Sequence, residues 1–182
     1  MLVLGSKSPR RAEILRSAGI PFIVRAGDSA EEHRPGEAAT DYVRRLAREK
    51  ADAIEIHDGE IILTADTVVV VDGEILEKPL DAEDAARMLR LLAGREHQVI
   101  TGICLRAGDR EIVDACRTRV HFTPLTDAAI AAYVASGEPM DKAGAYAIQG
   151  LASKFIDHIE GDYFNVVGLP VSLVYRHLQE FS

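Results

Sequence analysis

Short apolar runs alternate with amphipathic stretches along the whole chain, and turn-forming residues separate them. Runs rich in β-branched and aliphatic residues predict strands at 2–4, 21–24, 61–71, 74–76, 98–105, 111–122 and 155–159. Apolar residues at helical spacing predict helices that begin after Ser8, Thr40, Asp81, Thr126 and Pro170. This order favours an α/β protein with a mixed sheet and flanking helices over a regular parallel alternation.

Turns and helix ends sharpen these boundaries. The pairs Asp72-Gly73 and Gly108-Asp109 each lie between two predicted strands and indicate hairpins. The helix capped by Thr40 is expected to run to about Ile56. Neither a repeat nor a linker-like stretch interrupts the pattern, which predicts one domain over residues 1–182.

Composition and charge limit the partners. The formal net charge is −8, so most of the surface repels nucleic acid and anionic lipid, and an anionic ligand needs a local cluster of cations. The charge argues against polymeric nucleic acid and leaves a small phosphorylated molecule open. The apolar run at 61–71 is interrupted by polar residues, which argues against a membrane span. Cys104 and Cys116 lie far from any CxxC spacing, and the first residues lack a signal-peptide pattern; both features predict a cytoplasmic protein.

The first candidate for anion binding is the run Ser6-Lys7-Ser8-Pro9-Arg10-Arg11. Ser8 suits a helix N-cap and Pro9 the first helical position, which puts both arginines in the first turn. Cations there oppose the helix dipole unless an anion binds beside them. The alternative is a solvated basic pair. The run matches neither GxxxxGK[ST] nor GxGxxG.

The second candidate is Asp66, which lies inside the apolar run at 61–71. Aspartate is depleted in strands and an unpaired buried carboxylate is costly, so this residue calls for a metal, a cation or a hydrogen-bonding role. A structural salt bridge is the simpler alternative to a general base or metal ligand. Glu31 and Glu32, in an acidic loop over 27–36, are candidates to complete a site for a hard cation, or they are ordinary loop acids.

Two lysines add to the positive charge. Lys50 falls into the apolar stripe of the second predicted helix, and the alternative to phosphate binding is a stem that covers apolar surface. Lys78 follows the short strand at 74–76, and its alternative is an exposed lysine at a strand end. The six histidines lack the spacing of a zinc hydrolase, and no Ser/His/Asp constellation is present.

Seven segments together resemble the Maf family of nucleoside triphosphate pyrophosphatases, in family order and over essentially the whole chain. They are SKSPRR (6–11), LAREKA (46–51), ADTVV (65–69), LEKP (76–79), HQVITG (97–102), DKAGAYAIQG (141–150) and NVVGLP (165–170). The resemblance implies a fold like that of inosine triphosphate pyrophosphatases, with two lobes around a central nucleotide cleft. It also implies a homodimer that uses Mg²⁺ or Mn²⁺ to release a monophosphate and pyrophosphate.

The resemblance also assigns roles to single residues. Asp66 matches the general base and Glu32 a metal-site carboxylate that acts with Asp66. Arg11, Thr67 and Gln149 match positions tied to substrate recognition. The full set of candidate substrate-binding residues is Ser6, Ser8, Arg10, Arg11, Lys50, Thr67, Lys78 and Gln149. Among these, Arg10, Lys50 and Lys78 match the phosphate-binding cations.

The segment at 142–150 is similar to the branch that acts on dTTP and UTP. The amide of Gln149 both donates and accepts, which suits the imide edge of a pyrimidine. Asp162 and Phe164 stand where the family usually has small polar residues, so they bear on the substrate range. The alternatives are a pyrophosphatase for 7-methyl-GTP or altered purine nucleotides, and a non-catalytic nucleotide-binding regulator of cell division.

Overall fold

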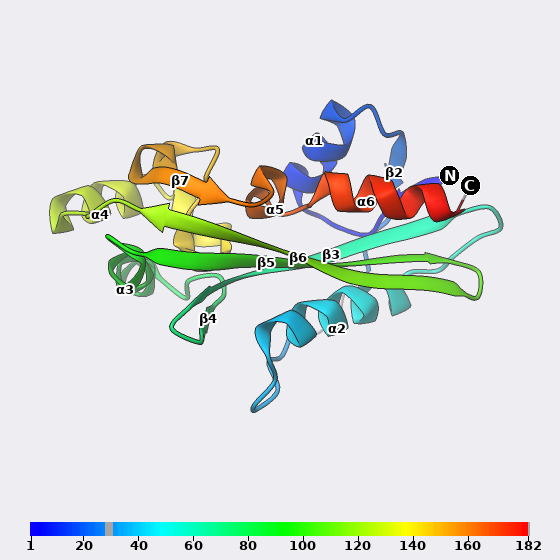
Figure 1. Ribbon diagram of the computed structural model, residues 1–182, viewed down its shortest axis with the longest axis horizontal. Coiled ribbons are helices and arrows are strands. Elements are labelled where there is room, and N and C mark those ends of the chain that lie inside the picture. The colour runs from blue at the N-terminus through cyan, green and yellow to red at the C-terminus, as the bar shows by residue number, and fades with distance from the viewer. Residues whose placement is uncertain (28–30, 182) are drawn as a thin grey trace. The chain divides into compact units, whose positions relative to one another are not determined.

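The computed structural model describes residues 1–27 and 31–181, and its mixed sheet confirms the predicted α/β class (Figure 1). The strand order is β2-β1-β3-β5-β6-β7, and β4 pairs with β3. β1 runs parallel to β2 and β3, whereas β3–β4 and β6–β7 are antiparallel. The strands are β1 (Leu2–Leu4), β2 (Phe22–Val24), β3 (Ile61–Val71), β4 (Glu74–Leu76), β5 (Glu96–Ala107), β6 (Arg110–Phe122) and β7 (Ile156–Glu160).

Five predicted helices are confirmed, and short helical segments were missed. The α-helices are α1 (Pro9–Ser17), α2 (Ala39–Asp52), α3 (Ala82–Leu92), α4 (Asp127–Ala135), α5 (Tyr163–Val167) and α6 (Val171–Leu178). The 3₁₀ segments are η1 (Glu138–Asp141), η2 (Ala143–Ala145), η3 (Leu151–Phe155) and η4 (Gln179–Phe181). α5 and the 3₁₀ segments are too short to show a helical period in sequence. None of the helices in the described ranges has the length and apolar character that crossing a membrane needs.

The predicted helix caps have mixed outcomes. The side chains of Asp81 and Thr126 accept hydrogen bonds from backbone N–H groups of α3 and α4, as expected. Ser8 occupies the N-cap position of α1, but its side chain makes no capping hydrogen bond. The prediction for Thr40 was wrong: α2 has Ala38 as its N-cap and ends at Asp52, short of the expected end.

Both predicted hairpin turns are confirmed. Asp72 and Gly73, with φ angles of 50° and 80°, connect β3 to β4, and Gly108 has a φ of 54° between β5 and β6. Two-residue hairpin turns need positive φ at both central residues or at the first alone, and glycine and aspartate adopt it at low cost.

The chain divides into two compact units, in agreement with the two lobes expected. The first unit comprises Met1–Thr67, Thr101–Cys116 and Phe164–Ser182, and the second comprises Val68–Ile100 and Arg117–Tyr163. β3, β5 and β6 each contribute residues to both units. A single domain over residues 1–182 stays a prediction.

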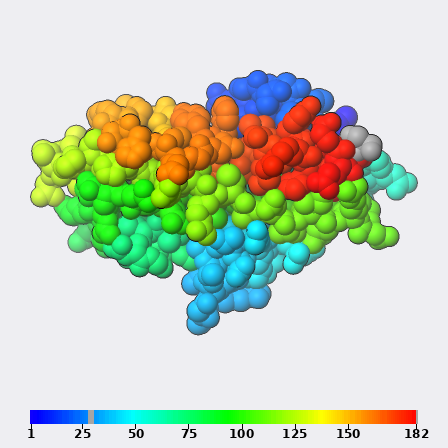
Figure 2. Space-filling view, in the orientation of Figure 1, coloured from blue at the N-terminus to red at the C-terminus, as the bar shows by residue number. Residues whose placement is uncertain are grey.

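In the first unit, alternate residues of the strands face opposite helices. Leu63 and Ala65 pack in one cluster with residues of α1 and α6, whereas Ile62 packs in a second cluster with Ala47 and Ala51 of α2. Above this first cluster, the N-terminal part of the chain and α6 lie side by side on the molecular surface (Figure 2). This alternation puts Ile62, Thr64 and Asp66 of β3 on the α2 face.

The second unit has an aromatic core. The rings of Phe122, Tyr146 and His97 meet edge to face, with centroid separations of 4.9–5.3 Å. Phe155 packs against Phe122 and Tyr133. His97 is 2% exposed, and its Nε2 lies 2.6 Å from the hydroxyl oxygen of Tyr146, so this histidine belongs to the core.

Candidate active site

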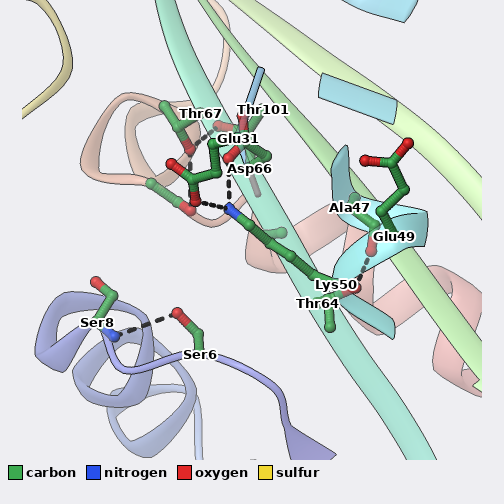
Figure 3. A network of polar contacts seen from close by, with 12 residues as sticks. Ser6, Ser8, Glu31, Ala47, Glu49, Lys50, Thr64, Asp66, Thr67 and Thr101 are labelled. Carbon is green, nitrogen blue, oxygen red and sulfur yellow. Dashed lines mark hydrogen bonds and ion pairs between the residues drawn. The ribbon is translucent and has the colours of Figure 1, made fainter. Parts of the chain in front are cut away.

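Asp66 lies on the face of β3 that packs against α2. Two residues earlier, the hydroxyl of Thr64 donates to the backbone oxygen of Ala47 in α2 at 2.5 Å. Lys50 follows Ala47 by about one helical turn, and its Nζ donates to Asp66 Oδ1 at 2.6 Å (Figure 3). Asp66 is 7% exposed. The aspartate that is anomalous in an apolar strand is therefore buried and paired with a cation.

A glycine in β5 allows α2 to lie close to the sheet. A Cβ added at Gly102 would lie 2.4 Å from the carbonyl carbon and oxygen of Val43 in α2, well inside van der Waals contact. Only glycine accommodates this approach without a shift of the helix. The close contact holds α2, and with it Lys50, against the strands.

A second carboxylate shares the ammonium of Lys50. Glu31 Oε1 lies 2.6 Å from Lys50 Nζ, so the cation bridges Glu31 and Asp66 (Figure 3). The side chain of Glu32 is exposed, and its backbone oxygen accepts a hydrogen bond from Arg45. The acid that joins Asp66 is thus Glu31, the neighbour of the residue favoured by the resemblance. Part of the predicted acidic loop, residues 28–30, lies outside the described residues.

Burial sets the protonation behaviour of Asp66. Its removal from water raises the pKa of this carboxyl, and the charges of Lys50 and Arg11 oppose that effect. A raised pKa makes the carboxylate a better proton acceptor than an exposed aspartate. The direction of this shift favours the general-base role predicted for Asp66 over a purely structural salt bridge.

Arg11 joins three separate segments of the first unit. Its Nη1 donates to the backbone oxygen of Ala65 at 2.8 Å and to the hydroxyl of Ser6 at 3.2 Å. Its Nε donates to the backbone oxygen of Gly168 at 2.9 Å, and its Nη2 to Thr67 Oγ1 at 3.3 Å. With its donors aimed at these oxygens, Arg11 holds α1 against β3 and the turn before α6.

The turn before α1 presents hydrogen-bond donors. The backbone N–H of Ser8 donates to Ser6 Oγ at 3.2 Å, and Ser8 itself has an extended backbone at the N-cap of α1 (Figure 3). Pro9 occupies the first turn, followed by Arg10 and Arg11, with no acidic residue in that turn. Helix N–H groups and the positive end of the dipole favour an anion at this position.

The hydroxyl groups of Thr67 in β3 and Thr101 in β5 link these two strands to the segment before α6. Their hydroxyl oxygens lie 2.9 Å apart, and Thr101 also donates to the backbone oxygen of Asn165 at 3.2 Å. Sequence reasoning did not single out Thr101, although it lies in one of the matching segments. Thr101 is 0% exposed, and a buried hydroxyl needs a hydrogen-bond partner, but this burial is visible only in the structure.

The two remaining predicted residues belong to the second unit. Lys78 is exposed in the bend after β4, and Gln149 is exposed in a turn. Their segments are linked, because the backbone N–H of Gly144 donates to the backbone oxygen of Glu77 at 3.1 Å. Gly144 has a φ of 68° and packs against Val69 so closely that a Cβ would lie 2.7 Å from the valine side chain.

Tyr133 and Glu138 hold the turn that carries Gln149. The hydroxyl of Tyr133 donates to Glu138 Oε2 at 2.6 Å and accepts from the backbone N–H of Ala147 at 3.1 Å. The Glu138 carboxylate also accepts from the backbone N–H of Leu151, at 3.0 and 3.1 Å. Hydrogen bonds at Ala147 and Leu151 therefore hold the turn on both sides of Gln149. Sequence reasoning missed this feature.

The acidic side chains of the site have the chemistry of ligands for the divalent metal that the resemblance implies. Glu31 and Asp66 supply carboxylate oxygens, the hard ligands that Mg²⁺ and Mn²⁺ prefer. In this structure the ammonium of Lys50 lies 2.6 Å from an oxygen of each. Two acids that already share one cation fit a divalent ion at the same place.

The fold and this site define an α/β protein built around a buried, cation-paired aspartate beside a helix N-terminus. The sequence profile of the Maf-like protein family matches residues 1–181, and the chain belongs to that family. A protein named dTTP/UTP pyrophosphatase from Koribacter versatilis (strain Ellin345) is 50% identical over 179 residues, which cover 98% of this chain and 93% of the relative.

Two further comparisons agree. A dTTP/UTP pyrophosphatase from Symbiobacterium thermophilum is 50% identical over 182 residues, covering 100% of this chain and 94% of that protein. The solved structure of the Staphylococcus aureus Ham1 protein superposes with a TM-score of 0.57 at 13% identity, covering 100% of this chain and 99% of that one. The structural likeness supports the fold alone.

Proposed function

We propose that this chain is a nucleoside triphosphate pyrophosphatase that hydrolyses dTTP and UTP to the monophosphate and pyrophosphate. The observation that carries the proposal is the buried carboxylate of Asp66, held by Lys50 at 2.6 Å. The relatives named dTTP/UTP pyrophosphatase support the substrate class.

Asp66 is the proposed general base. It accepts a proton from a water molecule, and the water oxygen attacks the α-phosphorus in line with the bond to the leaving pyrophosphate. That P–O bond breaks, and its electron pair leaves with pyrophosphate. The raised pKa of Asp66 supports this role, because a base whose pKa lies nearer neutrality transfers protons more effectively.

Cations balance the charge of the triphosphate. Arg10, Lys50 and Lys78 are proposed to contact phosphate oxygens, with Ser6 and Ser8 as hydrogen-bond partners. Arg11 and Thr67 are proposed substrate-recognition residues, although the contacts of Arg11 with Ala65 and Gly168 favour a positioning role for its guanidinium. Fixed cations of this kind stabilise charge that develops on the leaving group.

A divalent cation fits the acidic end of the site. Asp66 would hold Mg²⁺ or Mn²⁺ together with an acid of the loop, Glu32 according to the resemblance and Glu31 according to its contact with Lys50. When bound, such an ion would neutralise phosphate charge and acidify a water molecule.

Gln149 is the proposed selector of the base. Its amide is suited to pair with the N–H and carbonyl of a thymine or uracil, which a purine presents in a different arrangement. A site built around such hydrogen bonds rejects a base that leaves its polar groups unpaired. Asp162 and Phe164 are proposed to modulate this range.

A competition assay tests the proposal. dTTP, UTP, 7-methyl-GTP and ITP are supplied together with Mg²⁺ or Mn²⁺, and each monophosphate is quantified. We expect dTMP and UMP to form first. Preferential loss of 7-methyl-GTP or ITP would assign the chain to another substrate class, and nucleotide binding without turnover would make it a non-catalytic regulator.

We also infer a cytoplasmic homodimer from the family resemblance. Neither Cys104 nor Cys116 takes part in a disulfide, which suits a reducing compartment. Light scattering coupled to size-exclusion chromatography tests the dimer, since a mass of 19.8 kDa corresponds to the monomer.

A further inference from the structure

Two histidines and an aspartate meet on the antiparallel strands β6 and β7, in the second unit and outside the residues proposed for catalysis. His121 of β6 is the direct cross-strand partner of His158 in β7. Their rings stack with centroids 5.0 Å apart and planes 20° from parallel. The two imidazoles therefore lie side by side on one face of the strand pair.

A break in the strand register adds Asp157 to this pair. His121 pairs with His158, yet the next residue, Phe122, pairs with Ile156, so β7 contains one extra residue at Asp157. In a regular strand, Asp157 and His158 would point to opposite faces. A β-bulge re-aims side chains, and here it turns the aspartate toward the same face as the histidines.

The side-chain contacts show this convergence directly. Nδ1 of His121 lies 2.7 Å from Asp157 Oδ1, and Nδ1 of His158 lies 3.0 Å from the same oxygen. One ligand atom from each of the three residues lies within 4.8 Å of the others. A tetrahedral zinc ion with bonds of about 2.0–2.1 Å holds its ligand atoms roughly 3.3 Å apart, so side-chain rotations must bring the three ligand atoms to this spacing.

We propose that His121, Asp157 and His158 form a second cation site, selective for a transition-metal dication such as Zn²⁺. Two imidazole nitrogens and one carboxylate oxygen are the ligand types that Zn²⁺ shares with other late first-row metals, whereas Mg²⁺ prefers oxygen alone. The ligands are open to solvent, with side-chain exposures of 32%, 47% and 63% for His121, Asp157 and His158. Water completes the coordination of the bound ion.

The surrounding charge does not oppose a dication. The nearest cation along β6 on the same face is Arg119, which is ion-paired with Glu160 of β7. Glu96 of β5 also lies 4.0 Å from Arg119. The site is thus separate from the Asp66 site in both its residues and its preferred metal.

The test is a titration of the full chain, without a polyhistidine tag, with ZnCl₂ by calorimetry. We expect His121→Ala and His158→Ala each to weaken zinc binding at this site by at least about tenfold. His57→Ala, which removes an exposed histidine elsewhere, should leave it unchanged. Mg²⁺-dependent turnover should be unaffected in all three variants, because none touches the proposed catalytic residues.

Side-chain NMR supplies a residue-level check. Substoichiometric Zn²⁺ should shift the ring signals of His121 and His158 before those of His33, His57 and His177. Equal zinc affinity in the wild type and both site variants would overturn the proposal, as would the absence of zinc binding in the wild type. Absence of Mg²⁺-dependent turnover in the wild-type chain would count against the proposed function and leave the zinc site standing.

Discussion

The ammonium of Lys50 lies 2.6 Å from Asp66 Oδ1, at a position where the aspartate side chain is 10% exposed. A buried carboxylate without a partner is costly, and a cation at this distance offsets part of that cost. The same ammonium also contacts Glu31. One lysine thus links the proposed base to the acidic loop, and changing either member of the pair should alter both protonation and turnover.

Replacing the proposed base should remove most of the activity. Asp66→Asn keeps the size and a hydrogen-bonding oxygen but accepts no proton, so we expect pyrophosphate release to fall by about 100- to 10,000-fold. The matched control is Asp72→Asn, because Asp72 is exposed in a turn with a φ of 50°, a conformation that asparagine adopts well. Turnover of Asp66→Asn within a few-fold of the control would disprove the assignment.

Asp66 was predictable because it breaks a local rule. An aspartate inside an apolar β-branched run conflicts with strand propensity, and such conflicts mark functional or strained positions. The choice between Glu31 and Glu32 was not predictable in the same way. Both are acids in an irregular loop, where no helical or strand period fixes which side chain points inward.

Removing the cation should shift the pH dependence of turnover. Lys50 lowers the pKa of Asp66 against the effect of burial, so Lys50→Met should raise that pKa further. The base acts in its deprotonated form, and the acid limb of the kcat/KM profile should therefore move to higher pH. Lys50→Arg, which keeps the charge, should move the limb less.

The measurement is kcat/KM for dTTP from pH 5 to 9 in the wild type and both variants. An acid limb that stays in place in Lys50→Met would show that Asp66 is not the group that titrates. The double variant Lys50→Met/Asp66→Asn provides a check on stability. Because the two side chains are in contact, its loss of unfolding free energy should be smaller than the sum of the single losses.

The fold was easier to predict than the site, because its signals are local. Asp72-Gly73 and Asp81 act within a few residues, and both predictions were confirmed. The start of α2 was missed, since Ala38 offers no capping side chain and Thr40 offered a misleading one. The contact of Arg11 with Gly168 spans 157 positions, and only the tertiary fold determines such pairs.

The turn carrying Gln149 should lose its preorganisation when Glu138 is removed. The Glu138 carboxylate accepts from Tyr133 and from the backbone N–H of Leu151, so Glu138→Ala leaves both donors without this partner. We expect KM for dTTP to rise by about tenfold, the equivalent of about 1.4 kcal/mol, with a smaller effect on kcat.

Two further variants serve as controls for this measurement. Glu83→Ala removes an exposed acid of α3 in the same unit and should leave KM unchanged. Glu138→Gln keeps oxygen acceptors for the turn and should restore part of the affinity. If Glu138→Ala retains the wild-type KM while it lowers the melting temperature, the residue acts only in folding.

Burial of His97 makes the free energy of unfolding depend on pH. Burial lowers the pKa of this imidazole to about 3, and its Nδ1 has no hydrogen-bond partner among the described residues. A folded pKa below the unfolded value of about 6.5 means that the unfolded chain binds the proton first. The stability from neutral His97 is therefore complete above about pH 6.5 and is lost as the pH falls toward 3.

The expected slope is up to about 1.4 kcal/mol of unfolding free energy per pH unit below pH 6.5. His97→Gln keeps a polar group near the hydroxyl of Tyr146 but does not titrate, so this part of the slope should vanish. Urea denaturation of both proteins at pH 7.5, 6.5, 5.5 and 4.5 measures it, with His57→Gln as the exposed control. Since every other group is shared, the difference between wild type and His97→Gln isolates this histidine. A difference independent of pH would mean that His97 takes up its proton equally in the folded and unfolded chain.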